Sequence, residues 1–445
     1  MTFYFFPKLQ RIHLRCLVFI CICIFNLPIN PESNDSNGYN CDKYNSIFDL
    51  SQCIVRKHPD YRIEEIKLKE ISGRKKIASY YFPANPVFTS YVATRKGEST
   101  GPTLLSGPNS ANNFQVMVNQ EIFTNGKREI AVQIADEEFK AQVFRLESVK
   151  RILEFDALKK MTRFRYLHLE EENSLNSLNL VKELKKISKA RVNEGLSPGI
   201  DESLSESEEI RIFKIWNQTH RLSENSKSEL EVLLGMPVEL DSIKMQYWVM
   251  PSDLPKEKAD LIQMAMQMRP ELSLSEKEIE LAVLRQNEVR RQKIPNVSLG
   301  AFAQNDGFNE RVVGGMLTFP IIIWRDYEGE KIIASSKIDN SKELKESVSR
   351  NIKQEVLFAL TNYINLSEEI NLYDESKMER AESDLKNLQE AIRFGKIKII
   401  DAINQQRILL QTKLNYLNTK SEFELSQIEL VRVLGLPIHS LGMNQ

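Results

Sequence analysis

The chain has 445 residues, of which 27% are charged, with a formal net charge of −1 and a mean hydropathy of −0.36. The balanced charge argues against a nucleic-acid-binding protein, because such proteins carry a concentrated basic surplus. The hydropathy excludes a bundle of membrane-spanning helices, since each would need about 20 consecutive apolar residues and no such run follows the N-terminus.

Residues 1–30 are predicted to be a signal peptide. Lys8, Arg11 and Arg15 precede the apolar stretch CLVFICICIFNLP, which is too short to span a membrane. Segment 31–45 is polar, as expected for an exposed mature N-terminus. A buried hydrophobic segment is the alternative interpretation of the apolar stretch.

The cysteines leave lipid attachment and disulfide bonding open and do not form a metal site. Cys21 or Cys23 could carry a lipid, although isoleucines stand where a small residue is expected before such a cysteine. Cys41 and Cys53 remain in the mature part and could pair in an oxidising compartment, which the sequence leaves open. The histidines have no ligand spacing, so neither a metal nor a cofactor is expected.

The mature sequence contains an internal duplication. The stretch LGMP in the middle recurs as LGLP near the C-terminus, about 200 residues later. At the same offset Gly195 corresponds to Gly395, and Asp201 corresponds to Asp401. The predicted organisation is a first repeat at 46–239, a linker at 240–253, a second repeat at 254–439 and a tail at 440–445.

Each repeat begins with a helix and two strands. The helices are expected at about 61–81 and 272–293, with Pro59 and Pro270 at their starts, where a missing N–H is tolerated. Period-two alternation then predicts strands. They are expected at about 86–94 and 113–121 in the first repeat, and at about 296–304 and 311–320 in the second.

Each repeat continues with a long and a shorter helix. Segments 127–194 and 326–394 contain no proline and would each span roughly 100 Å as helices. Hairpin tips follow at about 195–199 and 394–397, and the shorter helices are expected at 199–234 and 396–434. The leading helix and the shorter helix together nearly match the long helix in length.

The predicted fold class is mainly α with a small β part. Two hairpins cannot close a sheet, and their open edges would be reactive. Three copies would supply twelve strands, enough for a membrane barrel, with the helices forming a cylinder beneath it. Aromatic residues near the strand–helix junctions would form an interfacial girdle, or are ordinary core residues: Tyr80, Tyr81, Phe82, Phe123, Phe319, Trp324 and Tyr327.

This duplicated order, with a G-x-x-x-x-x-D turn and an L-G-x-P ending, resembles the TolC family of outer-membrane efflux channels. The resemblance covers nearly the whole mature chain. The HP and RPEL helix starts are similar to those of the branch that serves metal-cation and drug efflux pumps. The resemblance implies a homotrimer whose β-barrel lies in the outer-membrane lipid and continues as a long α-helical barrel, a tunnel through the periplasm.

The resemblance also implies that the hairpin turns, with Gly195 and Gly395, form a periplasmic gate. Asp401 and Asp201 match the aspartates of the family's turns, where a ring of carboxylates favours cations. Asn404 stands where a second acidic residue is often found, which implies a weaker ring. Basic partners across the interface would come from Arg393 and Lys396, unless these side chains are solvated. Asp401 has a second interpretation, stabilisation of a helix N-terminus.

The implied function is that of an exit duct, which passively conducts small toxic solutes from an inner-membrane RND-type pump and a periplasmic adaptor. An enzyme is not expected, because no nucleophile–base pair or phosphate loop is visible. The alternative is the channel of a type I protein secretion system fed by an ABC exporter, which shares this architecture. A coiled-coil scaffold without a pore would leave the hairpins and the export signal unexplained.

Met264, Met266 and Met268 suggest a copper site, because thioethers bind Cu(I). Their spacing of two does not place them on one helical face. Packing is therefore the favoured interpretation.

Overall fold

The computed structural model describes residues 47–96, 110–234, 257–305, 311–373 and 396–444, with short pieces at 237, 247–251, 254–255, 387, 390–391 and 394. Residues 44–445 form one compact unit. The predicted signal peptide, the polar segment 31–45 and the cysteines Cys21, Cys23 and Cys41 lie outside the described residues. Cys53 lies within them and is disulfide-bonded.

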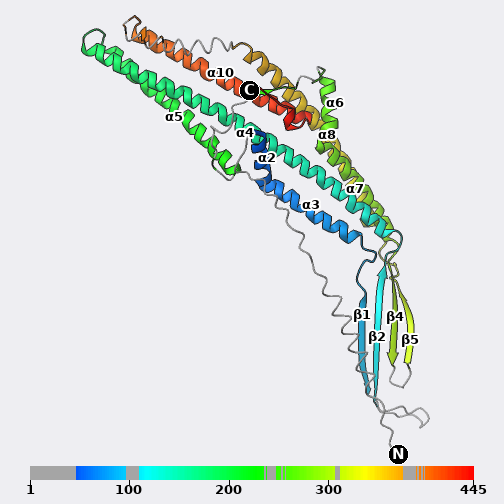
Figure 1. The fold of residues 1–445 in the computed structure, drawn as a ribbon. Coiled ribbons are helices and arrows are strands. Elements are labelled where there is room, and N and C mark those ends of the chain that lie inside the picture. Colours follow the sequence, from blue (N-terminus) through cyan, green and yellow to red (C-terminus); the bar gives the residue numbers. More distant parts are fainter. Residues whose placement is uncertain are drawn as a thin grey trace, which may run out of the picture. The chain divides into compact units, whose positions relative to one another are not determined.

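The two repeats have the same succession of elements (Figure 1). The first contains α3 (Pro59–Ala78), β1 (Val87–Lys96), β2 (Ser110–Ile122), α4 (Lys127–Asn193) and α5 (Ile200–Leu234). The second contains α7 (Pro270–Gln292), β4 (Val297–Asn305), β5 (Arg311–Thr318), α8 (Glu328–Ile370) and α10 (Ile399–Leu434). The prediction of a mainly helical chain with a small antiparallel sheet is confirmed.

Shorter elements accompany the repeats. They are α2 (Ile47–Lys57), β3 (Tyr247–Val249), α6 (Lys258–Met268), the 3-10 helix η2 (Ile438–Ser440) and β6 (Gly442–Asn444). β3 and β6 form a separate two-stranded sheet. α2 contacts both α3 and α5, and α6 contacts both α8 and α10. By these contacts α2 packs on helices of the first repeat and α6 packs on helices of the second.

The four long strands form one antiparallel sheet in the order β1-β2-β4-β5. The two repeats meet between β2 and β4, where Val118 pairs with Ala301. The register places most apolar side chains on one face: Phe88, Val92, Phe114, Val116, Val118, Leu299, Ala301, Ala303, Val313 and Leu317. The other face carries most of the polar ones: Thr89, Asn113, Gln115, Asn119, Glu121, Ser298, Gln304 and Thr318.

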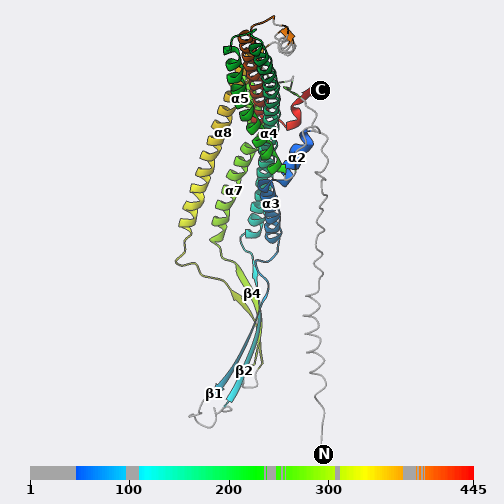
Figure 2. The same cartoon turned by 90° about the vertical axis from the view of Figure 1, so that its left-hand side faces the viewer.

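The helices form a layer in which α4 has short helices on both sides (Figures 1 and 2). α3 and α5 pack against α4, and α7 and α10 pack against both α4 and α8. Lys75 of α3 pairs with Asp136 in the first part of α4 at 2.7 Å. Lys185 in the last part of α4 pairs with Glu206 of α5 at 3.0 Å. The two short helices therefore follow one another along the long helix.

The end of α10 meets the start of α7. The guanidinium of Arg151 on α4 donates to the backbone oxygen of Arg432, in the last turn of α10. Arg269, directly before α7, lies 2.6 Å from Glu355 of α8. Burial lowers the pKa of Arg151 to about 10, which leaves the group charged at neutral pH. Charged groups thus hold four helices together at this level.

The largest buried cluster lies beside this junction. It brings together side chains from α2, α4, α5, α10 and η2: Ile54, Phe155, Leu158, Leu230, Ile428, Val431 and Ile438. A second cluster joins α6, α8 and α10 through Leu261, Val356 and Val433. The hydrophobic core is therefore concentrated where the short elements cross the helical layer.

The second long helix is shorter than predicted. An unbroken helix was expected over 326–394, but α8 ends at Ile370 and residues 371–373 form a turn and a bend. Glu368 and Glu369 lie at the negative end of the helix dipole, where acidic side chains are unfavourable. Asn371 has a low helix propensity. These residues disfavour continuation of the helix.

Candidate functional site

The turn between α4 and α5 contains Gly195, which has a φ of +70°. This left-handed conformation is open to glycine and costly for other residues. The amide of Leu196 donates to the oxygen of Arg191 at 2.8 Å, and the amide of Gly195 donates to the oxygen of Val192 at 3.0 Å. The pair of bonds is a Schellman motif, which satisfies the last carbonyls of α4 and reverses the chain before α5.

The turn before α10 has the same hydrogen bond 200 residues later. The amide of Lys396 donates to the oxygen of Ala391 at 2.8 Å. Gly395 and Arg393 lie outside the described residues. The two repeats thus share the six-residue hydrogen bond of their turns.

A small hydrophobic cluster holds the two turns together. Leu184 of α4 packs with Ile399, Ala402 and Ile403 in the first turns of α10, and Leu204 of α5 lies against them. The starts of α5 and α10 are therefore both attached to the end of α4.

The structure places the two predicted aspartates at the starts of neighbouring helices. Asp201 lies in the first turn of α5 and is half-buried, and Asp401 lies in the first turn of α10 and is exposed. Within the described part of the chain, neither carboxylate has a hydrogen-bond or ion-pair partner. Asn404 is exposed one turn beyond Asp401. The ammonium of Lys396 lies 5.9 Å from the ring centroid of Phe394.

A charged cluster near the turns was not predicted. The side chain of Glu208 on α5 is fully buried. It accepts hydrogen bonds from Arg211 at 2.6 Å and from Nε of Arg407, on α10, at 2.8 Å. Burial by itself would raise the pKa of Glu208, but the hydrogen bonds from the two arginines outweigh burial and lower the pKa. The ionised carboxylate thus links the two repeats close to their turns.

One part of this cluster has a signal in the sequence. Leu204, Glu208 and Ile212 recur at a spacing of four, which places a carboxylate within the apolar stripe of α5. A buried carboxylate needs a charged partner. The partner Arg407 lies 199 residues away, and no local pattern indicates it.

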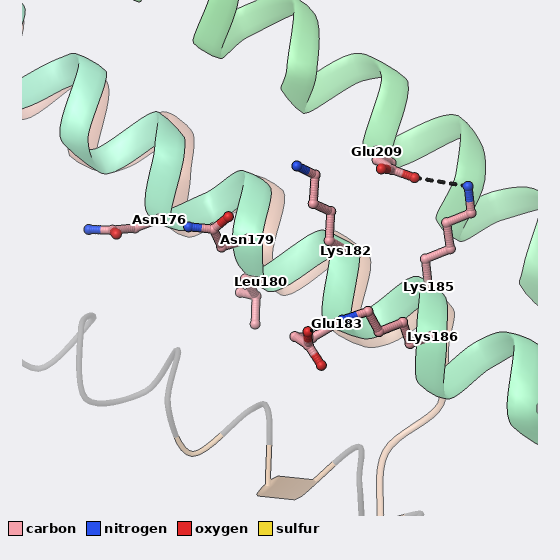
Figure 3. A pocket seen from close by; sticks show the side chains of 8 residues that line it. All are labelled: Asn176, Asn179, Leu180, Lys182, Glu183, Lys185, Lys186 and Glu209. Atoms are coloured by element: carbon pink, nitrogen blue, oxygen red, sulfur yellow. Dashed lines mark hydrogen bonds and ion pairs between the residues drawn. The ribbon is translucent and has the colours of Figure 1, made fainter.

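A pocket of about 570 Å³ lies against α4 and α5 not far from the first turn (Figure 3). Its lining residues are Asn176, Asn179, Leu180, Lys182, Glu183, Lys185, Lys186 and Glu209. Lys185 lies 2.9 Å from Glu209, and Lys186 lies 2.7 Å from Glu183. The lysines outnumber the acidic side chains, so this surface is basic.

Of the methionines in α6, Met266 takes part in packing, whereas Met268 is 49% exposed. Met266 lies against the cluster that joins α6, α8 and α10, and its sulfur is 3.8 Å from the hydroxyl of Ser349. The described residues contain no group of three or more His, Cys, Asp or Glu side chains placed to hold a metal ion. Nor does this part of the chain include a helix that is both long enough and apolar enough to cross a membrane.

No protein-family model matches the sequence, and no curated protein does. Several solved structures are similar. The outer membrane channel CmeC of Campylobacter jejuni aligns over 87% of this chain and 85% of its own, with a TM-score of 0.69 and 14% identity. The outer membrane protein VceC of Vibrio cholerae aligns over 87% and 96%, with a TM-score of 0.67 and 16% identity. The MtrE outer membrane channel of Neisseria gonorrhoeae, in its open state, aligns over 88% and 89%, with a TM-score of 0.67 and 14% identity.

At this identity the similarity concerns the fold, and it extends over both repeats. The resemblance indicated by the repeated motifs is confirmed at that level. The chain has the fold of the TolC family of outer-membrane channels.

Proposed function

We propose that three copies of this chain form the outer-membrane exit duct of a tripartite efflux pump. The duct passively conducts small toxic solutes, metal cations or drugs, to the exterior. An inner-membrane pump and a periplasmic adaptor deliver the solutes to the helical end. The fold shared with outer-membrane channels supports this function.

The observation that carries the proposal is that the sheet and the helical layer both have open edges, which no other part of the described chain covers. The sheet has β1 and β5 as its outer strands. The helical layer ends in α8 on one side and in α3 and α5 on the other. Both helical edges expose large apolar side chains: Ile63, Ile66, Ile77, Ile210 and Phe213 on α3 and α5, and Ile332, Ile333, Leu357 and Phe358 on α8. A neighbouring copy would bury both sets.

The strands fit a barrel with its apolar face toward lipid. Three sheets of four strands give twelve, an even number of the kind found in bacterial outer-membrane barrels. Tyr81 and Trp324 are 77% and 92% exposed, which argues against core packing within one chain. Both lie between a strand and a helix, where an aromatic girdle would meet the membrane interface.

Detergent-extracted full-length protein is expected to be trimeric in native mass spectrometry and to form pores in planar bilayers. Phe358→Glu should reduce the trimer strongly, because burying a phenylalanine contributes about 1.5–3 kcal/mol at each interface. Val143→Glu is the matched control, since Val143 is exposed but lies on α4, away from both edges. A stable monomer, or trimers that conduct no ions, would contradict the proposal.

We place the gate of the duct at the hairpin turns. Opening would require the turns of the two repeats to separate, and two contacts oppose this. One is the small apolar cluster around Leu184 and Ile403. The other is the ion pair between Glu208 and Arg407. Asp401, exposed at the start of α10, would then line the aperture.

Asp401→Ala is expected to lower the preference for cations over anions by about twofold, since an exposed carboxylate acts through solvent. The measurement is the reversal potential in a salt gradient across a planar bilayer. Asp339→Ala is the control, because Asp339 is an exposed aspartate of α8 far along the chain from either turn. An unchanged reversal potential would remove Asp401 from the gate and leave helix stabilisation as its role.

A further inference from the structure

A second pocket, of about 430 Å³, lies where α3, α4, α7 and α8 run side by side. All four helices contribute to its lining. Because α4 and α7 separate α3 from α8, the layer must bend around the pocket for all four to reach it. The pocket therefore lies on the concave face of the layer. In a closed cylinder built from such layers, the concave face is the inner wall.

The floor of the pocket is apolar. Ala141 of α4 and Leu281 and Ala282 of α7 are buried at its base. Leu344 of α8 also lines it and is 47% exposed. An accessible leucine beside a buried apolar base offers surface to an apolar ligand. The volume is within the range of roughly 300–1,000 Å³ that holds drug-sized molecules.

The charged side chains around the floor are mostly basic. Four are basic (Arg74, Arg145, Arg285 and Lys337) and two are acidic (Glu138 and Glu278). Both acidic groups are neutralised across the contact between α4 and α7. Arg145 lies 2.8 Å from Glu278, and Arg285 lies 2.6 Å from Glu138.

The basic groups beyond these pairs stand on opposite sides of the pocket. Arg74 lies on α3 and is more than half exposed, in a surface pair with Glu70, which is not part of the lining. Lys337 lies on α8, is exposed, and has no ion-pair partner among the described residues. An anionic group between these two side chains would be attracted from both sides and could accept a charge-assisted hydrogen bond from one of them.

We propose that this pocket binds amphipathic organic anions, with the apolar part on the floor and the acidic group between Arg74 and Lys337. The pocket would be a contact site for cargo on the wall of the duct, an assignment that rests on the proposed function. A cation of the same size would be repelled by the basic excess. An uncharged molecule would contact the apolar floor but would gain no attraction from Arg74 and Lys337.

Two fluorescent probes with the same ring system test this: 1-anilinonaphthalene-8-sulfonate, which is an anion, and N-phenyl-1-naphthylamine, which lacks the sulfonate. Each is titrated into the full-length protein in lipid nanodiscs, with empty nanodiscs as the reference. The anion is expected to bind at one site per chain and more tightly than the neutral probe. Equal affinity for the two probes would overturn the proposal.

The double variant Arg74→Gln/Lys337→Gln should weaken binding of the anion by at least about fivefold, as for the loss of a charge-assisted hydrogen bond. Its affinity for the neutral probe should be unchanged. Lys342→Gln is the matched control, because Lys342 is an exposed lysine of α8 outside the lining. If the double variant binds the anion like the unmodified protein, the pocket is not the site.

Native mass spectrometry and conductance on the same preparation separate the two proposals. Conducting trimers that do not select the anion would refute the pocket alone. Monomers that bind the anion more tightly than the neutral probe, and lose this preference in the double variant, would refute the duct. The assignment of the pocket to organic anions would then still hold.

Discussion

Glu424→Leu is expected to destabilise the protein by about 3–5 kcal/mol, the cost of removing one partner from a buried ion pair. The side chain of Glu424, on α10, is only 4% exposed and pairs with Arg165 of α4, which is 8% exposed. The hydroxyl of Tyr166 donates to the same carboxylate at 2.6 Å. Leucine would take the carboxylate away from both donors in a site that water does not reach.

The protonation states agree with these roles. Burial and the adjacent Glu424 carboxylate raise the pKa of Tyr166. Its hydroxyl therefore stays protonated and donates a hydrogen bond to Glu424. Burial also raises the pKa of Glu424, while the guanidinium of Arg165 opposes the rise. The three groups therefore act as one unit, and the effects of single substitutions should not add.

Chemical unfolding of the detergent-solubilised protein, followed by tryptophan fluorescence, measures the effect. The triple variant Arg165→Met/Tyr166→Phe/Glu424→Leu should recover most of the loss, because apolar replacement of a whole buried charged network is often neutral. Glu422→Leu, an exposed position of the same helix, should change stability by no more than about 0.5 kcal/mol. A triple variant as unstable as Glu424→Leu would show that the unpaired buried groups are not the cause.

Gly435→Ala is expected to lower the free energy of unfolding by about 2–5 kcal/mol. Gly435 ends α10 with a φ of +88°, and a side chain in this region costs roughly 1–2 kcal/mol. In addition, a Cβ on Gly435 would lie 2.5 Å from Cβ of Met268 and 2.9 Å from its carbonyl carbon. Overpacking of this kind adds about 1–3 kcal/mol. The substitution should force apart the junction between the end of α10 and the end of α6.

Gly195→Ala is the matched control, because it separates the two contributions. Gly195 has a φ of +70°, but no neighbouring atom of the described residues lies within 4 Å of the position that a Cβ would take. Its replacement should cost only the conformational part, roughly 1–2 kcal/mol. Both variants are compared by the same unfolding measurement. Equal losses would mean that the close approach to Met268 contributes nothing.

Local signals in the sequence located most elements. Pro59 and Pro270 mark the starts of α3 and α7 because proline suits a first helical turn. Alternation along Val297, Leu299 and Ala301 indicated β4, because neighbouring side chains in a strand point to opposite faces. The sequence did not predict the end of α8 at Ile370. No glycine or proline marks this position, and residues that only weakly disfavour a helix occur both inside helices and at their ends.

Some features of the candidate site could be predicted from the sequence, and others could not. The two turns were visible in the repeat, because a glycine and a hydrogen-bonded reversal are local features of the chain. The link between Glu208 and Arg407 and the pocket between Arg74 and Lys337 were not visible. Each depends on which helices become neighbours, and no local pattern specifies that.

By itself the sequence determined the duplicated order of helices and strands, the turns and the mainly helical class. These follow from backbone preferences and from the periodicity of apolar residues, which act over a few residues. Only the tertiary structure decided that α3 and α5 follow one another along α4, that α7 and α10 lie between α4 and α8, and where charges from distant segments meet. Such contacts arise because apolar stripes must be buried against whichever surface is complementary, and complementarity is a property of the assembled layer.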